Sequence, residues 1–316
     1  MPYIKLLNYV LKMKTYNLKP FYSKTEARKK EGDWVDEKDY DILINSDCDA
    51  YDENGEPLFF FRKNKIPTNL CKRAYESLRT AATPTNNRGS AGGIVSQETE
   101  TTQNVGAKTK TRIRIKKRDG TLSNTNRANT VNSGLVGYFD RNPRFPFCRQ
   151  TAWMEKNFKQ FAKAYPYIKY IDNLFADSCP SKYKTQKEIA DKTHKDFLIK
   201  DTVFTTITVN KNFRTALHID GGDFEGGLGN LAVLEAGNYT GGYTVLPRYR
   251  VAFDVRSGDV CFFNVHEHHA NTEIKAKLAY ERISVVCYYR KNMHYCLDAK
   301  SELERAKNRQ AGESLK

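Results

Sequence analysis

The sequence predicts an α+β protein with a β-sandwich or jelly-roll core and flanking helices. Six short runs of β-branched and aromatic residues follow one another in about the last third of the chain, separated by glycines and other turn residues. The runs cover residues 204–209, 230–237, 243–247, 250–255, 259–265 and 282–289. Ahead of them, apolar side chains recur at helical spacing from Met154 to Tyr165, and Pro166 predicts the end of that helix. Thr185 and Glu188 fit a capping box, which predicts the start of a second helix.

Charge and cysteine usage narrow the classes of protein that the chain can belong to. Its 316 residues hold 52 Lys and Arg against 37 Asp and Glu, and the net charge of +15 favours a polyanionic partner. No apolar run approaches the ~18–20 residues that span a bilayer, so we expect no membrane protein. The seven cysteines are odd in number and form no CxxC pair. This pattern predicts reduced thiols in an intracellular compartment and no cysteine zinc site.

Composition divides the chain into four segments. Residues 1–81 mix aromatic and charged residues and are expected to form a helical or mixed extension that packs against the rest. Residues 82–106 are rich in Thr, Asn, Gly and Ser and have almost no large apolar side chains, so we expect a flexible linker or loop. Residues 107–298 form the predicted core domain, and residues 299–316 a charged tail or terminal helix.

A strongly basic stretch opens the predicted core domain. Residues 108–118 carry seven Lys or Arg and no acid. Arg112, Arg114 and Lys116 alternate with isoleucines, and an Asp-Gly pair follows, which predicts one arm of a hairpin with a cationic face. Two interpretations fit this arm. It is either a solvated edge strand protected by charge, or a strip that contacts the phosphates of a nucleic acid.

Five of the six histidines lie between residues 218 and 294, and two short motifs among them indicate a metal site. His218 and Asp220 form an H-x-D pair. In a strand, side chains two residues apart project from the same face, so both can reach one ion. A third imidazole would complete a two-histidine, one-carboxylate face, which binds Fe(II) and leaves three positions open. The segment HEHHANT at 266–272 follows a predicted strand and offers three candidate histidines.

An arginine opens the last predicted strand. Arg282 stands thirteen residues after His269. A dicarboxylic cosubstrate bound to the iron through its 2-oxo acid end would need a cation for its far carboxylate, and the planar guanidinium binds a carboxylate with two parallel hydrogen bonds. The combined pattern is more specific than any of its parts. The alternative is a group of structural core histidines beside a strand-edge arginine.

Together with these motifs, the segment from about residue 135 to 290 resembles the TET/JBP family. This family comprises iron(II)- and 2-oxoglutarate-dependent dioxygenases that oxidise the 5-methyl group of pyrimidines in nucleic acid. The resemblance is carried by GLVGYFDRNPRFPFCRQTAW, FTTITVNKNFRTALHIDGGD, GGYTVLP, SGDVCFFNVHEHHANTEI and YERISVVCYYRKN. It covers roughly half of the chain and implies a double-stranded β-helix (jelly-roll) core with flanking helices. Residues 1–105 lie outside it, and the cysteine-rich zinc region of animal TET proteins is absent from the sequence.

Residue by residue, the resemblance implies that His218, Asp220 and His269 are the iron ligands. His269 is preferred because the ligand histidine of the family is followed by a small residue and then a Thr- or Asn-containing turn, as in HANT here. The resemblance also implies that Arg282 binds the far carboxylate of 2-oxoglutarate with help from Ser284, and that dioxygen is the second cosubstrate.

The family further implies double-stranded DNA as the partner, with the target nucleotide flipped into the pocket. Asp223 occupies the place at which TET enzymes carry an Asn that touches the base, unless it only shapes a turn. An ionised carboxylate only accepts hydrogen bonds, which suits the exocyclic amine of 5-methylcytosine and the ring N–H of thymine alike. His266 and His268 stay as alternative iron ligands, as supports of the ligands, or as DNA contacts. The basic strip at 108–118 would contact phosphates.

The sequence therefore predicts an enzyme that oxidises 5-methylcytosine or thymine in DNA to the 5-hydroxymethyl base, with further oxidation left open. Two other functions fit the same residues: a 2-oxoglutarate-dependent hydroxylase of protein side chains or small molecules, and a catalytically inactive relative that binds nucleic acid. The basic charge disfavours the first, and the intact set of site residues disfavours the second. We expect the protein inside the cell, and in the nucleus if the source is eukaryotic. The sequence does not identify a protein partner.

Overall fold

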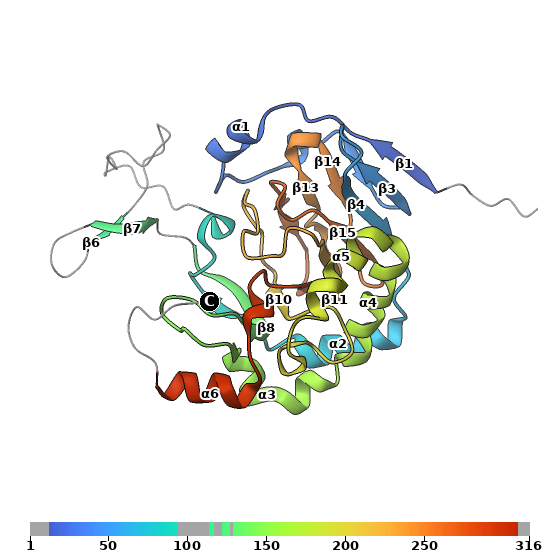
Figure 1. The fold of residues 1–316 in the computed structure, drawn as a ribbon. Coiled ribbons are helices and arrows are strands. Elements are labelled where there is room, and N and C mark those ends of the chain that lie inside the picture. The colour runs from blue at the N-terminus through green and yellow to red at the C-terminus, as the bar shows by residue number, and fades with distance from the viewer. Residues whose placement is uncertain (1–12, 94–113, 117–121, 127–128, 309–316) are drawn as a thin grey trace, which may run out of the picture.

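The computed structural model describes residues 13–93, 114–116, 122–126 and 129–308, and two β-sheets dominate it (Figure 1). The large sheet has the strand order β1-β3-β4-β15-β11-β18-β10-β8-β5, and β9 pairs with β8. These strands are β1 (Lys14–Asn17), β3 (Cys48–Tyr51), β4 (Pro57–Arg62), β5 (Thr83–Thr85), β8 (Val131–Phe139), β9 (Arg149–Gln150), β10 (Thr206–Lys211), β11 (Gly229–Ala236), β15 (Val260–Phe263) and β18 (Glu281–Tyr288).

A small sheet packs against one face of the large sheet. Its order is β16-β13-β14-β2, with β2 at Ile42–Ile44, β13 at Thr244–Leu246, β14 at Val251–Phe253 and β16 at Ala270–Asn271. Apolar side chains from both sheets meet in one core, among them Phe59 and Leu231 of the large sheet and Leu246 and Phe253 of the small one. Two strand pairs stand outside both sheets. They are β12 (Thr240–Gly241) with β17 (Ile274–Lys275), and β6 (Arg114–Lys116) with β7 (Leu122–Asn126).

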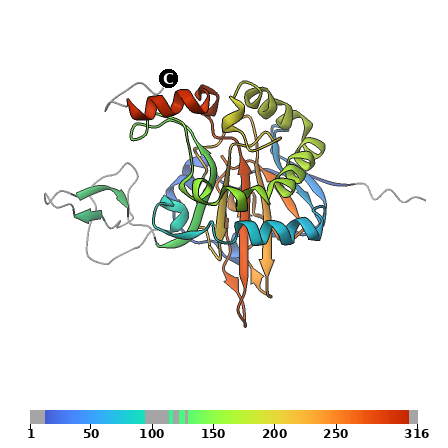
Figure 2. The ribbon, with the colours of Figure 1, turned by 90° about the horizontal axis from the view of Figure 1, so that it is seen from below.

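Four helices cover the opposite face of the large sheet (Figure 2): α2 (Thr68–Leu78), α3 (Ala152–Ala162), α4 (Tyr165–Ser178) and α5 (Pro180–Ala190). The alternation along β18 separates the two faces. Ile283, Val285 and Cys287 are fully buried in the core under the helices. Ser284 and Val286 point to the other face, toward the small sheet. A central strand that is buried on both faces consists of a nearly continuous run of apolar residues. This is why β18 could be predicted from the sequence.

The structure contains all six predicted strands, as β10, β11, β13, β14, β15 and β18. The helix predicted from Met154 is α3, but Pro166 does not end the helical region. It lies in the first turn of α4, where its missing N–H costs no hydrogen bond. The capping box is wrong. Thr185 and Glu188 lie inside α5, which begins at Pro180.

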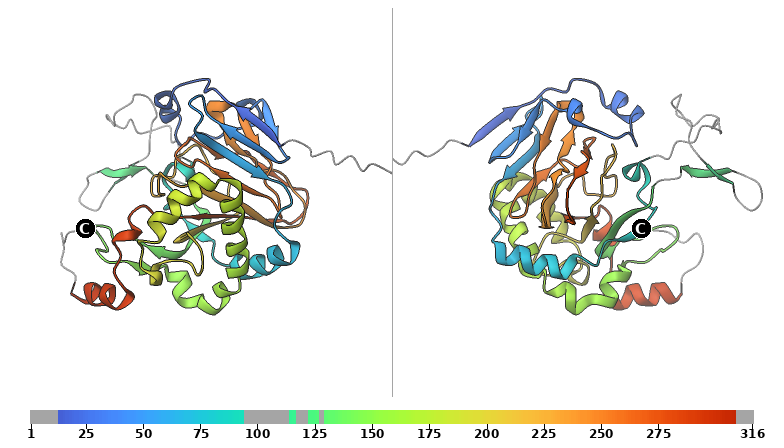
Figure 3. Two further views of the ribbon diagram at one scale, coloured as in Figure 1. Left: turned by 45° about the vertical axis from the view of Figure 1, so that its right-hand side comes forward. Right: turned by 180° about the vertical axis from the view of Figure 1, so that it is seen from behind.

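The first 81 residues contribute strands to both sheets. β1, β3 and β4 extend the large sheet beyond β15, and β2 closes the small sheet beside β14. Figure 3 shows these strands, in blue, beside the orange strands of the core. The boundary predicted after residue 81 therefore does not coincide with a break in the sheets.

The segment 82–106, expected as a flexible linker, begins with regular structure. β5 pairs with β8 at the edge of the large sheet, and Gly89–Gly92 form a short 3-10 helix, η2. Residues 94–106 lie outside the described part of the chain. The side chains of this segment gave no sign of regular structure. Its order comes from backbone hydrogen bonds to the open edge of the large sheet. In the segment expected as a charged tail or terminal helix, α6 spans Ala299–Lys307.

Two cysteines are joined across 148 residues of sequence. Cys148 and Cys296 form a disulfide with their Cα atoms 5.8 Å apart, so the prediction that all thiols are reduced is wrong for this pair. Their proximity comes from tertiary folding, which cysteine spacing does not encode. The other five cysteines are free and buried. In the described residues, no helix has the length and apolar character needed to cross a membrane.

Candidate metal centre and substrate pocket

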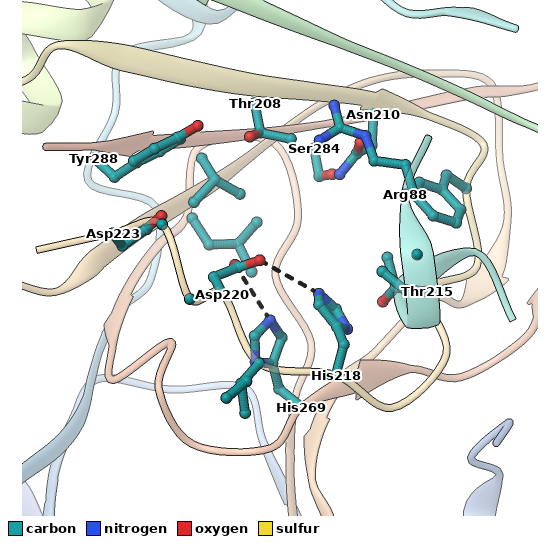
Figure 4. Close-up of a pocket in the computed structure, with 18 of the residues that line it drawn as sticks. Arg88, Thr208, Asn210, Thr215, His218, Asp220, Asp223, His269, Ser284 and Tyr288 are labelled. Carbon is teal, nitrogen blue, oxygen red and sulfur yellow. Dashed lines mark ion pairs between the residues drawn. The ribbon is translucent and has the colours of Figure 1, made fainter. Parts of the chain in front are cut away.

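A cavity of about 310 Å³ lies between the two sheets. Thr208 and Asn210 of β10 and Ser284 of β18 line it from the large sheet, and Thr244 of β13 lines it from the small sheet. The loop between β10 and β11 supplies a further wall, which carries the H-x-D motif. Figure 4 shows the polar side chains that point into this space.

Three residues predicted as ligands meet in the cavity. Nε2 of His218 lies 3.7 Å from Oδ1 of Asp220, and Nε2 of His269 lies 3.6 Å from Oδ2 of the same carboxylate (Figure 4). The three ligand atoms all lie within 4.8 Å of one another. The backbones of His218 and His269 exchange two N–H···O hydrogen bonds, of 3.0 and 2.9 Å. This isolated bridge, rather than a regular strand, sets the two imidazoles side by side.

The orientation of both rings leaves Nε2 free for a ligand. Nδ1 of His218 lies 2.8 Å from the carbonyl oxygen of Ala216, and Nδ1 of His269 lies 2.9 Å from that of Glu267. Because a carbonyl oxygen only accepts, Nδ1 carries a proton in both rings, and Nε2 is the ring nitrogen that faces Asp220. Burial and the neighbouring His218 lower the pKa of His269 to about 4, so this ring is neutral near pH 7. Two imidazoles, each with Nε2 toward Asp220, and one carboxylate fit Fe(II).

A buried ion pair supports the segment that carries His269. Nη1 of Arg248 lies 2.6 Å from Oε2 of Glu267, and the two side chains are 7% and 3% exposed. Nε of Arg248 also donates to the carbonyl oxygen of Tyr22 at 3.0 Å. The other oxygen of the Glu267 carboxylate accepts the backbone N–H of His268 at 2.9 Å. The N-terminal part of the chain thus helps to fix the position of His269.

The two neighbouring histidines lie apart from the three ligand atoms. Nε2 of His268 lies 3.1 Å from Oε1 of Glu31, in the segment that follows α1 (Lys24–Lys29). Nε2 of His266 is buried and has no hydrogen-bond partner within the described residues. Neither histidine lines the cavity or belongs to the group of ligand atoms around Asp220.

Arg282 lies on the same face of β18 as Ser284, one step beyond the cavity wall. Its side chain is buried, and neither Nε nor Nη2 has a hydrogen-bond partner in the described part of the chain. Burial lowers the pKa of this guanidinium, so an anion beside it would be stabilised. Gly242, at φ +67°, makes room for it, because a Cβ there would lie 3.0 Å from Nε of Arg282. A buried, unpaired cation beside the cavity suits a dicarboxylate.

Asp223 lies on another wall of the cavity, close to Tyr288 (Figure 4). Its side chain is buried, and within the described residues no hydrogen bond reaches its carboxyl group. Burial and the charge of Asp220 raise the pKa of Asp223 well above its usual value, and Arg290 opposes this shift. Arg290 itself is paired with Asp140, whose Oδ1 lies 2.8 Å from Nη2. The carboxyl group of Asp223 is therefore a free polar group that faces the cavity.

Sequence reasoning missed two arginines of the cavity. Arg88 precedes η2, and its side chain reaches toward Asn210 and Ser284 (Figure 4). A lone arginine in a Gly- and Ser-rich stretch carries no signal. Arg290 did carry one, because extending the alternation of Arg282 and Ser284 along β18 leads to it.

The basic hairpin predicted from residue 107 onward is present as the antiparallel pair β6 and β7. Arg112 lies outside the described residues. Arg114 and Lys116 belong to β6, of which the structure describes the backbone alone. Their contact with phosphates stays a prediction.

Comparisons of sequence place the chain among oxygenases. The Tet_JBP model, described as the oxygenase domain of the 2OGFeDO superfamily, matches residues 134–291. The bifunctional helicase and thymine dioxygenase JBP2 of Trypanosoma cruzi (strain CL Brener) is 32% identical over 267 residues, which are 83% of this chain and 21% of the relative. Thymine dioxygenase JBP1 of Trypanosoma brucei brucei is 38% identical over 164 residues, which are 50% of this chain and 19% of the relative. The chain therefore spans about a fifth of the length of these relatives.

A solved structure shares the fold. NgTET1 in complex with 5mC DNA matches with a TM-score of 0.53 at 15% identity, and the match covers 88% of each chain. At this identity the likeness concerns the fold alone. It agrees with a mixed arrangement of a large sheet and helices.

Proposed function

Because the chain belongs to the Tet_JBP oxygenase family, we propose that it is an iron(II)- and 2-oxoglutarate-dependent dioxygenase that oxidises the 5-methyl group of a pyrimidine in DNA. One observation carries the proposal. Two imidazoles and a carboxylate converge in a cavity. On the same face of the large sheet, next to that cavity, lies a buried arginine whose Nε and Nη2 have no hydrogen-bond partner among the described residues. A binding module without catalysis has no need of such a set.

Each residue has a distinct role in this proposal. His218 and His269 would hold Fe(II) through Nε2, and Asp220 through its carboxylate. Arg282 would bind the far carboxylate of 2-oxoglutarate through Nε and Nη2, and the hydroxyl group of Ser284 would assist. When bound, iron, 2-oxoglutarate and dioxygen supply the oxidising power that the C–H bond of a methyl group requires. The chain contributes orientation and a cavity that limits the access of water.

The substrate would enter as a flipped nucleotide, since a methyl group inside a duplex cannot reach the buried ligands. Asp223 faces the cavity and would read the edge of the base. Thymine offers a ring N–H to this carboxyl group, and 5-methylcytosine an exocyclic amine. The relatives named as thymine dioxygenases make thymine the first base to test. In a eukaryotic cell, this DNA substrate would place the protein in the nucleus.

We also propose that the two sheets form a double-stranded β-helix, with residues 107–298 as the oxygenase domain. From β10 onward the chain passes back and forth between the sheets. β10, β11, β15 and β18 lie in the large sheet, and β13, β14 and β16 lie in the small one. The cavity lies between them, as a ligand site does in the mouth of a barrel.

Nucleoside mass spectrometry tests the proposed activity. The purified chain is incubated with Fe(II), 2-oxoglutarate and ascorbate on duplex DNA with and without 5-methylcytosine. We expect 5-hydroxymethyluracil from thymine, or oxidised 5-methylcytosine, and expect neither with the Asp220→Ala variant. Iron binding without any oxidised base would instead favour a hydroxylase of proteins or small molecules. An absence of 2-oxoglutarate turnover on every substrate would favour an inactive relative.

A further inference from the structure

A series of stacked arginine and phenylalanine side chains leads from the cavity to the surface. The guanidinium of Arg290 lies 5.3 Å from the ring centroid of Phe139, and that of Arg149 lies 4.8 Å from the same centroid. Arg149 also lies 4.3 Å from the ring centroid of Phe145, and Arg144 lies 5.2 Å from it. These five residues, in the order Arg290, Phe139, Arg149, Phe145 and Arg144, are called the Arg–Phe ladder below.

One end of the ladder lies in the cavity and the other in solvent. Arg290 lines the cavity together with Asp223. Arg144 is exposed and lies in a turn closed by Asn142, whose Oδ1 accepts the backbone N–H groups of Arg144 and Phe145. The ladder therefore begins where the flipped base would be read and ends on the outside of the molecule.

Neither of the two outer guanidinium groups forms an ion pair with a described residue, although the charge of Asp140 acts favourably on Arg149. Asp140 neutralises Arg290. Arg149 reaches only the backbone carbonyl of Asp140, at 3.5 Å, and Arg144 has no ion pair with a described residue. Burial and the neighbouring charge of Arg290 lower the pKa of Arg149, and an anion at this position would offset that cost. The guanidinium groups of Arg144 and Arg149 thus lie over phenylalanine rings without an ion pair to a described residue.

The base of the ladder is rigid. Cys148, next to Arg149, is bonded to Cys296. Glu302 of α6 accepts the backbone N–H of Cys148 at 2.7 Å and pairs with Arg141, and both side chains of this pair are buried. Binding an anion here therefore requires little ordering of the chain, which favours affinity.

We propose that the Arg–Phe ladder is the track on which the DNA backbone next to the flipped nucleotide docks, with Arg144 and Arg149 in contact with phosphates. This inference rests on the proposed function. The guanidinium fork matches a phosphate, and the cations follow one another outward from the cavity, as phosphates do along a strand that enters a pocket. The net charge of +15 fits the same polyanionic partner. Unlike the basic strip of β6, this surface is described in full.

DNA binding in the absence of iron and 2-oxoglutarate tests the ladder apart from catalysis. Fluorescence anisotropy is measured on a labelled thymine-containing duplex over a range of salt concentrations. The double variant Arg144→Gln with Arg149→Gln is expected to bind about tenfold more weakly or worse at 0.1 M salt. Its log–log salt slope should fall by about 1.8, because each lost phosphate contact removes about 0.9.

A matched control removes the same charge elsewhere. Lys72 and Arg73 are exposed on α2, which covers the opposite face of the large sheet. The variant Lys72→Gln with Arg73→Gln should keep nearly the affinity and slope of the unmodified chain. Equal effects of the ladder and control variants would overturn the proposal, since the ladder would then act only through net charge.

Single variants keep the test valid if the double variant fails to fold. Arg144→Gln changes only an exposed side chain and should lower the slope by about 0.9. Arg149→Lys retains the charge without the planar group, so affinity should fall while the slope stays. If the chain oxidises DNA and the ladder variants bind as the unmodified chain does, the ladder alone is refuted. If ladder-dependent binding occurs without oxidation, the proposed activity fails and the DNA contact stands.

Discussion

Glu267 holds His269 by two means at once. Its carbonyl oxygen accepts the Nδ1–H of His269, and its carboxylate is fixed by Arg248. The ring can present Nε2 to the cavity only while this carbonyl stays in place. An arginine remote from the ligand atoms therefore controls the geometry of one of them, in the way that outer hydrogen bonds tune metal ligands in general.

We expect Arg248→Met to weaken both the fold and the metal site. It leaves the buried Glu267 carboxylate without an ion-pair partner among the described residues, which costs about 3–5 kcal/mol of unfolding free energy. Loss of the outer support should weaken Fe(II) binding about 10–100-fold. Urea unfolding and anaerobic metal titration measure the two effects. Arg250→Met is the control, because Arg250 pairs with Asp41 at the surface, where an ion pair contributes about 0–1 kcal/mol. Metal affinities that are equal in the two variants would contradict the role of Arg248.

Replacing Arg282 should act in opposite directions on cosubstrate binding and on stability. Arg282→Gln removes charge-assisted hydrogen bonds. The loss of one such bond costs about 1.5–3 kcal/mol, so 2-oxoglutarate should bind at least about 10-fold more weakly. The same change removes a buried cation with unpaired Nε and Nη2, so the unfolding free energy of the free protein should not fall. Calorimetric titration and urea unfolding check these two signs. A destabilised variant with unchanged 2-oxoglutarate affinity would show that Arg282 is structural.

At the scale of elements, β18 contacts the helical layer through Glu281 and lines the cavity through Ser284. Glu281 begins the strand and accepts hydrogen bonds from Tyr75 of α2 at 2.6 Å, from Arg79, which directly follows α2, at 3.2 Å, and from Lys211 of β10. The next residue, Arg282, points to the other face. Burial acts to raise the pKa of Glu281, but the hydrogen bonds from Lys211, Tyr75 and Arg79 outweigh it and lower the pKa to about 2.

This cluster predicts a pH-dependent contribution to stability. The folded pKa of Glu281 lies below the unfolded value of about 4.3, so its contribution is present above pH ~4.3 and is lost as the pH falls toward 2. Its size is about 1–3 kcal/mol at neutral pH. Glu281→Gln should therefore be less stable than the unmodified chain at pH 7, and the gap should narrow between pH 5 and 2 in urea unfolding. A gap that stays constant over this range would contradict the assignment.

The elements that the sequence predicted are those whose signal is local. The alternation in β18 and the apolar runs of β11 and β15 are visible in a few residues, and the H-x-D pair is a local motif as well. The strand β4, by contrast, is defined by pairing with β15, about 200 residues later in the chain. β5 exists only because β8 offers it an edge. Arg88 could not be placed in the cavity from sequence, since its position depends on that pairing.

At the scale of the whole molecule, distant parts of the chain complete one another. The core between the sheets combines Phe59 and Phe61 of β4 with Leu231 of β11 and Phe253 of β14. The N-terminal segment also supplies Tyr22 to Arg248 and Glu31 to His268. The first 81 residues thus support the site from outside the cavity.

The disulfide between Cys148 and Cys296 predicts both the number of reactive thiols and a contribution to stability. With Cys148 and Cys296 bonded, five of the seven thiols should react with a thiol reagent in denaturant, and all seven after reduction. In the chain-entropy model, a cross-link over 148 residues stabilises the fold by about 5 kcal/mol. Reduction should therefore lower Tm by about 8 °C. The double variant Cys148→Ser with Cys296→Ser should have the Tm of the reduced protein, and added reductant should not change this Tm. Seven reactive thiols before reduction would show that the pair is not bonded in solution, and the base of the ladder would then depend on Glu302 and Arg141 alone.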